Sequence, residues 1–248
     1  MAINAVNYAD ERAARVVMAA VARSTGHQPA ARWAATLLVP TACLLAYSGP
    51  AGADTTTEFW PELRVWIPVD DSWRVLLTTS GTRDRETGER VESQGSAYAD
   101  YRLSRSISFR TGYSYADDMP ASTHKITVDR FFNFAFTYTW HLGDHTDIAN
   151  RMRIDAGDDG GTSYQRYRDR IRFQHEFPVL GHEFSPYGQL EAYYDTRYDT
   201  VNRYRLEVGT LTYIGRCVEL DTYFGRQRDT APSLKYTNGF GITLNVYL

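Results

Sequence analysis

The sequence predicts an all-β protein: a transmembrane antiparallel up-and-down β-barrel of about 10–12 strands, preceded by a cleaved signal peptide. Three observations lead to this fold class. A short apolar run near the amino terminus ends at a small-residue cleavage site. Beyond it, apolar and polar residues alternate in many short segments, which is the period of a β-strand. Several of these segments carry arginines and carboxylates on their polar face.

The first 53 residues have the order of a secretory signal. Four arginines precede an apolar run over residues 33–47, and Pro50 is followed by small residues at Ala51 and Ala53. The run is shorter than the roughly 20 residues that a spanning helix needs, so we expect cleavage rather than anchoring. This divides the chain into a signal peptide, 1–53, and a barrel, 54–248. A translation start at Met18 would give a leader of more usual length.

Charge content argues against a nucleic-acid-binding protein, and cysteine content argues against a disulfide-stabilised mature chain. The chain has 27 basic and 30 acidic residues, and four of the basic and two of the acidic ones lie in the leader. A mildly acidic mature chain argues against nucleic-acid binding, which needs a basic face. Of the two cysteines, Cys43 lies in the leader and Cys217 in the mature chain, so the mature chain has no intramolecular disulfide.

Alternation recurs in about eleven segments, each close to the length of a tilted membrane-spanning strand. An odd count would start the first strand on the outer side. We therefore expect either that the first segment does not span fully or that residues 125–142 contain two strands. The segments are 59–67, 73–82, 97–103, 107–115, 125–142, 148–156, 164–177, 184–195, 201–213, 218–227 and 240–248.

The connections alternate between tight and long, which predicts short periplasmic turns and longer outer loops. Residues 157–163 are one of the expected long loops, and their acidic, glycine-rich start lacks the ligand spacing of a calcium site. The last segment has the composition of an outer-membrane assembly signal, although it ends in leucine rather than an aromatic residue. Its apolar face consists of Phe240, Ile242, Leu244, Val246 and Leu248.

The polar faces of the later strands form a predicted ladder of charges lining the barrel lumen. Arginine suits such a lumen because it stays ionised and makes forked hydrogen bonds. Asp169 interrupts the apolar phase of its strand, which a membrane barrel tolerates at a rim. We expect aromatic residues at both rims, with Trp73, Trp140, Tyr213 and Tyr247 on the periplasmic side. The ladder comprises Arg151, Arg153, Asp155, Arg168, Arg170, Arg172, Glu191, Arg203, Arg205, Glu207, Glu219 and Asp221.

Four short motifs resemble a family of bacterial proteins described as domain of unknown function 2490. They are Trp60-Pro61-Glu62-Leu63, the strand over residues 150–155, the arginine-alternating strand over residues 167–173 that leads to Pro178, and the apolar carboxyl-terminal strand. The resemblance covers nearly all of residues 58–248. It implies an outer-membrane-type barrel and assigns no activity.

Three functions remain open from the sequence. The first is a structural, closed barrel with a charge-paired lumen, the second a narrow ion or small-solute pore, and the third a soluble lipocalin-like periplasmic barrel that turns its apolar faces inward. The mature histidines lie in no nucleophile motif, so we expect no enzyme, and His141 and His145 flank a turn without a third metal ligand.

We therefore expect no cofactor and no metal. The expected location is the outer membrane of a Gram-negative bacterium. The expected partners are membrane lipid, lipopolysaccharide and the outer-membrane assembly machinery, with no nucleic acid, and the oligomeric state is open.

Overall fold

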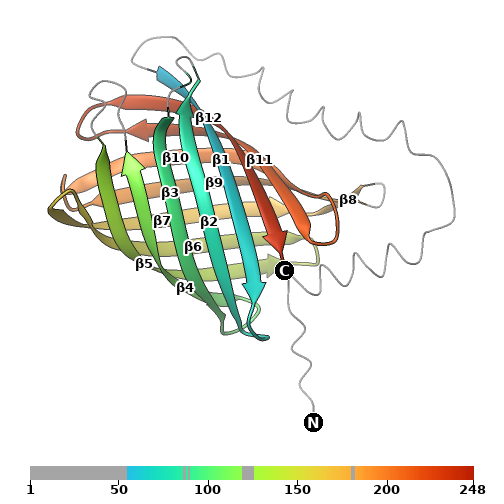
Figure 1. Cartoon of the computed structure of the whole chain (residues 1–248). Coiled ribbons are helices and arrows are strands. Elements are labelled where there is room, and N and C mark those ends of the chain that lie inside the picture. The colour runs from blue at the N-terminus through green and yellow to red at the C-terminus, as the bar shows by residue number, and fades with distance from the viewer. Residues whose placement is uncertain (1–54, 86–87, 89, 119–125, 180–181) are drawn as a thin grey trace, which may run out of the picture.

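The described part of the chain folds into a β-barrel, shown in the computed structural model of Figure 1, and this part contains eleven long strands. The structure describes residues 55–85, 88, 90–118, 126–179 and 182–248, so the predicted signal peptide lies outside the described residues. Within these ranges the chain has no helix with the length and apolarity needed to cross a membrane. The all-β, up-and-down fold class is confirmed.

The long strands contain 12 to 16 residues each, somewhat more than the alternating segments suggested. A further three-residue strand, β8, pairs with the start of β9. The elements are β1 (Thr55–Pro68), β2 (Trp73–Asp84), β3 (Arg90–Arg102), β4 (Ile107–Asp118), β5 (Thr127–Leu142), β6 (Thr146–Asp159), β7 (Thr162–His175), β8 (Phe177–Val179), β9 (His182–Asp195), β10 (Thr200–Tyr213), β11 (Val218–Asp229) and β12 (Lys235–Tyr247).

The barrel closes through a parallel pair. Each long strand pairs antiparallel with its neighbour in sequence, except that β1 pairs with β12 in parallel, with Phe59 opposite Phe240. Both expectations raised by the odd count were wrong, because β1 is a full strand and Thr127–Leu142 is a single strand. In an odd up-and-down barrel the first and last strands run the same way, so only a parallel ladder closes it.

Two ends of the barrel can be distinguished. We call the end where β2, β4, β6, β9 and β11 finish the loop-side rim, and the opposite end, where β12 finishes, the turn-side rim.

One connection at the loop-side rim is shorter than expected, because β6 and β7 are joined by Gly160 and Gly161 alone. Their φ angles of 60° and 106° allow a tight hairpin that most residues would resist, so the predicted loop over residues 157–163 was wrong.

Apolar side chains cover the outside of the barrel. Phe132 is 67% exposed, Leu190 55% and Ile171 54%, whereas Asp155 and Glu191 on the inner face are 0% and 4% exposed. A soluble lipocalin-like barrel has the opposite arrangement, with apolar side chains inside. The structure therefore does not support that alternative.

Two outward-facing features differ from expectation. Asp169 does not lie at a rim: it is near the middle of β7, where its Oδ1 accepts a hydrogen bond of 2.6 Å from Asn150 Nδ2. This bond lowers the cost of a carboxylate among apolar neighbours. Trp73 and Trp140 are exposed near the turn-side rim as expected. Tyr247, in contrast, stacks on Trp66 and its hydroxyl contacts Glu219 at 3.4 Å, so it points into the lumen.

Candidate functional site in the barrel lumen

The predicted charge ladder lies on the inner face of the barrel. Its twelve residues come from β6, β7, β9, β10 and β11, and period-two alternation turns all of them towards the lumen. The facing wall of β3, β4 and β5 carries several small buried side chains, among them Ser96, Ser114 and Ala135, although charged residues such as Asp100 and Arg110 lie nearer the turn-side rim. Small residues leave room for long arginine side chains that reach across a narrow lumen.

A network of ion pairs closes the loop-side end of the arginine wall. Arg197 bonds Asp195 at 2.7 Å and Asp159 at 2.5 Å, and Arg166 bonds Asp195 at 3.2 Å. Burial by itself lowers the pKa of Arg197, but its hydrogen bonds and proximity to Asp195 outweigh this effect and raise that pKa above its ordinary value. Arg197 was absent from the predicted ladder because it lies in a loop, where strand periodicity gives no signal.

The middle of the lumen holds a second network across β6, β7 and β9. Arg153 bonds Asp155 directly, and Arg168 Nη1 lies 3.8 Å from the other oxygen of the same carboxylate. Arg168 also bonds Glu191 Oε1 at 3.0 Å, and the Tyr193 hydroxyl donates to Glu191 Oε2 at 2.6 Å. Both buried carboxylates are therefore neutralised and hydrogen-bonded, as burial of a charge requires.

The β10 and β11 members are paired less fully than the sequence suggested. Arg203 bonds Asp229 at 2.5 Å, a partner outside the predicted ladder. Arg205 bonds the neutral Gln227 at 2.5 Å and lies 3.7 Å from Glu207. These partners depend on strand register, which the alternation of a single strand does not reveal.

Two acidic ladder residues contact neutral groups. Glu219 Oε1 accepts a hydrogen bond of 3.0 Å from Asn245 Nδ2, and Asp221 Oδ1 accepts one of 2.9 Å from the Tyr187 hydroxyl. Both carboxylates are buried. Neither of these two hydrogen bonds involves a ladder arginine.

Three ladder arginines take part in none of the ion pairs found among the described residues: Arg151, Arg170 and Arg172. The Nε atom of Arg151 and the Nε and Nη2 atoms of Arg172 are buried and lack a hydrogen-bond partner. The expected pairing of charges in the lumen therefore does not extend to these three.

Near the turn-side rim, a layer of lumenal side chains is held together by mutual contacts. We call this layer the floor and define it as Trp66, Tyr247, Arg74, Asp100 and Arg110. The rings of Trp66 and Tyr247 are stacked with centroids 6.2 Å apart, and the Arg74 guanidinium lies 4.2 Å from the Trp66 ring. Asp100 bonds Arg110 at 2.6 Å and Arg74 at 3.3 Å. Sequence reasoning missed the floor, although its residues share the inward phase of their strands.

The Trp60 ring lies in the lumen next to Gly225 of β11 and Gly239 of β12. A Cβ atom on Gly239 would overlap the Trp60 ring, and one on Gly225 would lie 2.6 Å from it. The Arg205 guanidinium lies 5.1 Å from the same ring. The glycines of β11 and β12 therefore make space for an aromatic ring inside the barrel.

A cavity of about 710 Å³ extends from the loop-side rim to the floor. Its lining includes Lys235 and Ser233 at the rim and Trp66, Arg110 and Arg172 at depth. Arg151 and Arg170 line it as well. The three arginines that lack an ion pair therefore line the cavity, together with carboxylates such as Glu207 and Asp221.

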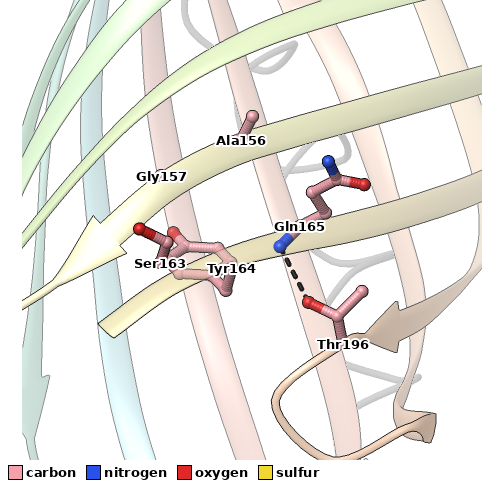
Figure 2. Close-up of a pocket in the computed structure, with 6 residues that line it drawn as sticks. All are labelled: Ala156, Gly157, Ser163, Tyr164, Gln165 and Thr196. Atoms are coloured by element: carbon pink, nitrogen blue, oxygen red, sulfur yellow. Dashed lines mark hydrogen bonds between the residues drawn. The ribbon is translucent and has the colours of Figure 1, made fainter.

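A second pocket, of about 410 Å³, lies at the loop-side ends of β6 and β7 (Figure 2). Figure 2 shows the hydrogen bond that closes one side of it, in which the Gln165 backbone N–H donates to Thr196 Oγ1 at 2.9 Å. Gly157, Ala156 and Ser163 supply much of the rest of the lining. Charged side chains do not line this pocket, which makes it a weaker candidate than the lumen.

The described residues contain no group of three or more His, Cys, Asp or Glu side chains placed to hold a metal. His141, considered with His145 in the sequence, contacts Asp147 Oδ1 at 2.8 Å and the Arg105 carbonyl at 3.3 Å. These contacts tie one strand end to the neighbouring turn, and no metal is needed to explain them.

Comparison with known proteins agrees with the resemblance seen in the sequence. The model of a family described as "Protein of unknown function (DUF2490)" matches residues 57–238. No curated protein matches the chain. Among solved structures, the crystal structure of the beta domain of the Bordetella autotransporter BrkA is similar with 13% identity and a TM-score of 0.45, covering 66% of this chain and 79% of that one.

Proposed function

Since the chain belongs to the DUF2490 family, whose description assigns no activity, we propose its function from the barrel itself: a Gram-negative outer-membrane barrel that is closed to ion flow. Two features support the proposal, the apolar exterior and the filled floor of the lumen. The floor is the observation that separates a closed barrel from a pore.

The exterior supports a membrane location. Strands of 12 to 16 residues exceed the roughly 9–11 that span a bilayer when tilted. Exposed Phe132, Phe134, Ile171 and Leu190 would be costly in water, whereas lipid accommodates them. Exposed Trp73 and Trp140 lie near the turn-side rim, where they would meet the membrane interface that aromatic side chains favour.

The same reasoning gives an orientation and partners. Outer-membrane barrels place their short turns in the periplasm, which would put the turn-side rim and the carboxyl end of β12 there. The apolar face of β12 is the part of the chain that we propose the outer-membrane assembly machinery recognises. Lipid would cover the exterior, and lipopolysaccharide would contact the loop-side rim.

The floor supports the closed state. Two stacked aromatic rings, the Asp100 carboxylate and two arginine side chains occupy the lumen between the cavity and the turn-side rim. An ion would have to displace this layer to pass. Arg74 and Arg110 both pair with Asp100, which holds the layer in place.

Membrane fractionation tests the location, and planar-bilayer recording of the purified barrel tests the closed state. We expect recovery with the outer membrane and no steady conductance. Trp66→Ala, which removes the largest ring of the floor, should introduce conductance, while Trp140→Ala on the exterior should not. Recovery in the soluble periplasm without detergent would overturn the membrane assignment.

A narrow pore is the second candidate, and the charged lining of the 710 Å³ cavity favours it. In a pore, the lumenal charges would face water and set ion selectivity. Steady conductance of the wild-type barrel that changes in Glu191→Ala would establish the pore and refute the closed barrel. Absence of conductance in the wild-type barrel, together with a lower unfolding midpoint in Glu191→Ala, would support the closed barrel.

The proposal includes neither an enzymatic activity nor a retained leader. The described histidine side chains, His141, His145 and His175, lie near the turn-side rim and do not line the cavity. We propose that the signal peptide is cleaved after Ala53. Amino-terminal sequencing of the protein from membranes should begin at Asp54, and an intact leader would contradict this.

A further inference from the structure

Two arginine pairs face each other across the ladder between β6 and β7, and only one has a carboxylate. Arg153 lies directly opposite Arg168, and Arg151 directly opposite Arg170. Asp155 lies between the first two, bonding Arg153 and approaching Arg168 at 3.8 Å. No ion pair of the described residues serves the second two. Like charges directly opposite on one sheet face are destabilising, so we expect another interaction to compensate the repulsion in the second pair.

The nearest carboxylate does not meet this need. Glu191 is the cross-strand neighbour of Arg170 on β9. However, its Oε1 accepts the bonds from Arg168 at 3.0 and 3.1 Å, and its Oε2 accepts the Tyr193 hydroxyl. Four guanidinium groups of this ladder thus share two carboxylates, Asp155 and Glu191, and two positive charges are left over.

A third arginine adds to this surplus. The Arg172 guanidinium stacks over the Tyr187 ring at 3.7 Å, which fixes its plane. The Tyr187 hydroxyl donates a hydrogen bond to Asp221, so the nearby acid bonds the tyrosine rather than the arginine. The Nε and Nη2 atoms of Arg172 are left without a partner, and these atoms form the edge of a guanidinium that binds an oxyanion in a bidentate manner.

We propose that Arg151, Arg170 and Arg172 form a binding site for a phosphate-bearing ligand at the base of the lumenal cavity. A phosphate group supplies the two negative charges and several acceptor oxygens that the three guanidinium groups lack. The cavity of about 710 Å³ has room for more than the anion itself and leads to the loop-side rim. The site does not depend on whether the barrel is closed to ion flow.

Calorimetric titration of the purified mature barrel in a neutral, phosphate-free detergent tests the site, with pyrophosphate as the probe. We expect saturable binding to the wild-type barrel and at least tenfold weaker binding in Arg170→Gln and in Arg151→Gln. The matched control is Arg203→Gln, which removes the same charge from the same cavity but from an arginine paired with Asp229. Its affinity should stay within threefold of wild type.

Misfolding is separated from loss of the site by the unfolding midpoint measured without ligand. Arg151→Gln removes a repulsive pair, so its midpoint should equal or exceed that of the wild type while binding falls. Absence of pyrophosphate binding to the wild-type barrel would overturn the proposal. Equal weakening in Arg203→Gln and Arg170→Gln would also overturn it, because it would indicate a general effect of net charge.

The source of the phosphate is distinguished by competition with a short-chain phosphatidic acid below its micellar concentration. If the lipid displaces pyrophosphate from the wild-type barrel but does not bind Arg170→Gln, the site takes a lipid headgroup. If pyrophosphate binds and the lipid does not compete, the site takes a free phosphate compound. Both results support a phosphate site, and failure of both ligands to bind refutes it.

Discussion

The two opposed arginine pairs between β6 and β7 differ in their carboxylate partners. Arg153 and Arg168 share Asp155, which is fully buried, and Arg168 also bonds Glu191. Arg151 and Arg170 occupy the same face one repeat nearer the turn-side rim and have no such partner. The first pair has the contacts of a structural network. The second lines the cavity without an ion-pair partner, as a ligand site would.

This difference shows how one repeating sequence pattern yields two kinds of environment. A buried charge network is stable when each charge has a partner, and it is strongly destabilised when one partner is removed. Arginines that face a cavity instead can keep part of their hydration. Substitutions should therefore have opposite effects on stability in the two pairs.

The largest expected effect is at Asp155. Asp155→Asn keeps the shape of the side chain but leaves Arg153 and Arg168 opposed without a carboxylate, as Arg151 and Arg170 are. We expect a loss of about 3–5 kcal/mol in the free energy of unfolding. Tryptophan fluorescence during denaturant unfolding of the barrel in lipid vesicles measures it. The exposed turn residue Asp144 provides a control, and a loss in Asp155→Asn no larger than in Asp144→Asn would show that the shared carboxylate does not stabilise the barrel.

An intermediate effect is expected at the next carboxylates of the lumen. Glu191→Gln removes the negative charge to which Arg168 and the Tyr193 hydroxyl bond. It should lower the free energy of unfolding by about 2 kcal/mol. Glu207→Gln should cost about 1 kcal/mol, because Arg205 bonds Gln227 more closely than Glu207. The same unfolding experiment ranks the two. The reverse order would mean that the distances to arginine do not govern their contributions.

Removing one member of the unpaired set should have the opposite sign. Arg151→Gln relieves the repulsion from Arg170 and should stabilise the ligand-free barrel, on the order of 0.5 kcal/mol. Arg153→Gln, two residues along the same strand, should destabilise it because Asp155 loses its direct partner. If both variants lower the unfolding free energy equally, the contrast between the pairs is wrong.

The smallest expected effect is that of salt. Raising the ionic strength from about 0.01 M to about 1 M shortens the Debye length from about 30 Å to about 3 Å. Screening should favour the wild-type barrel by a few tenths of a kcal/mol through the cavity-facing Arg151 and Arg170. The benefit should be smaller in Arg151→Gln. Equal salt dependence of the two proteins would place the wild-type effect elsewhere on the barrel.

The pattern of the chain already determined much of the fold. Period-two alternation turns every second residue to the same face, so the sequence predicted the β class, the segments that become strands and the inward phase of residues such as Arg153 and Glu191. The same alternation could not choose between an apolar core and an apolar exterior, because both give the same period. The arginines and carboxylates of the polar face favoured the exterior, and the exposed Phe132 and Leu190 agree with it.

Tertiary structure decided what depends on register and closure. The parallel pairing of β1 with β12 closes an odd barrel, and it involves residues from the two ends of the described chain, which no local pattern relates. Register decided that Arg203 bonds Asp229 and that Asp155 lies between Arg153 and Arg168. By itself, the sequence determined that charged side chains face the lumen. Which of them are paired, and which remain free to bind a ligand, was decided by the stagger of neighbouring strands, because pairing depends on distances between residues far apart in the chain.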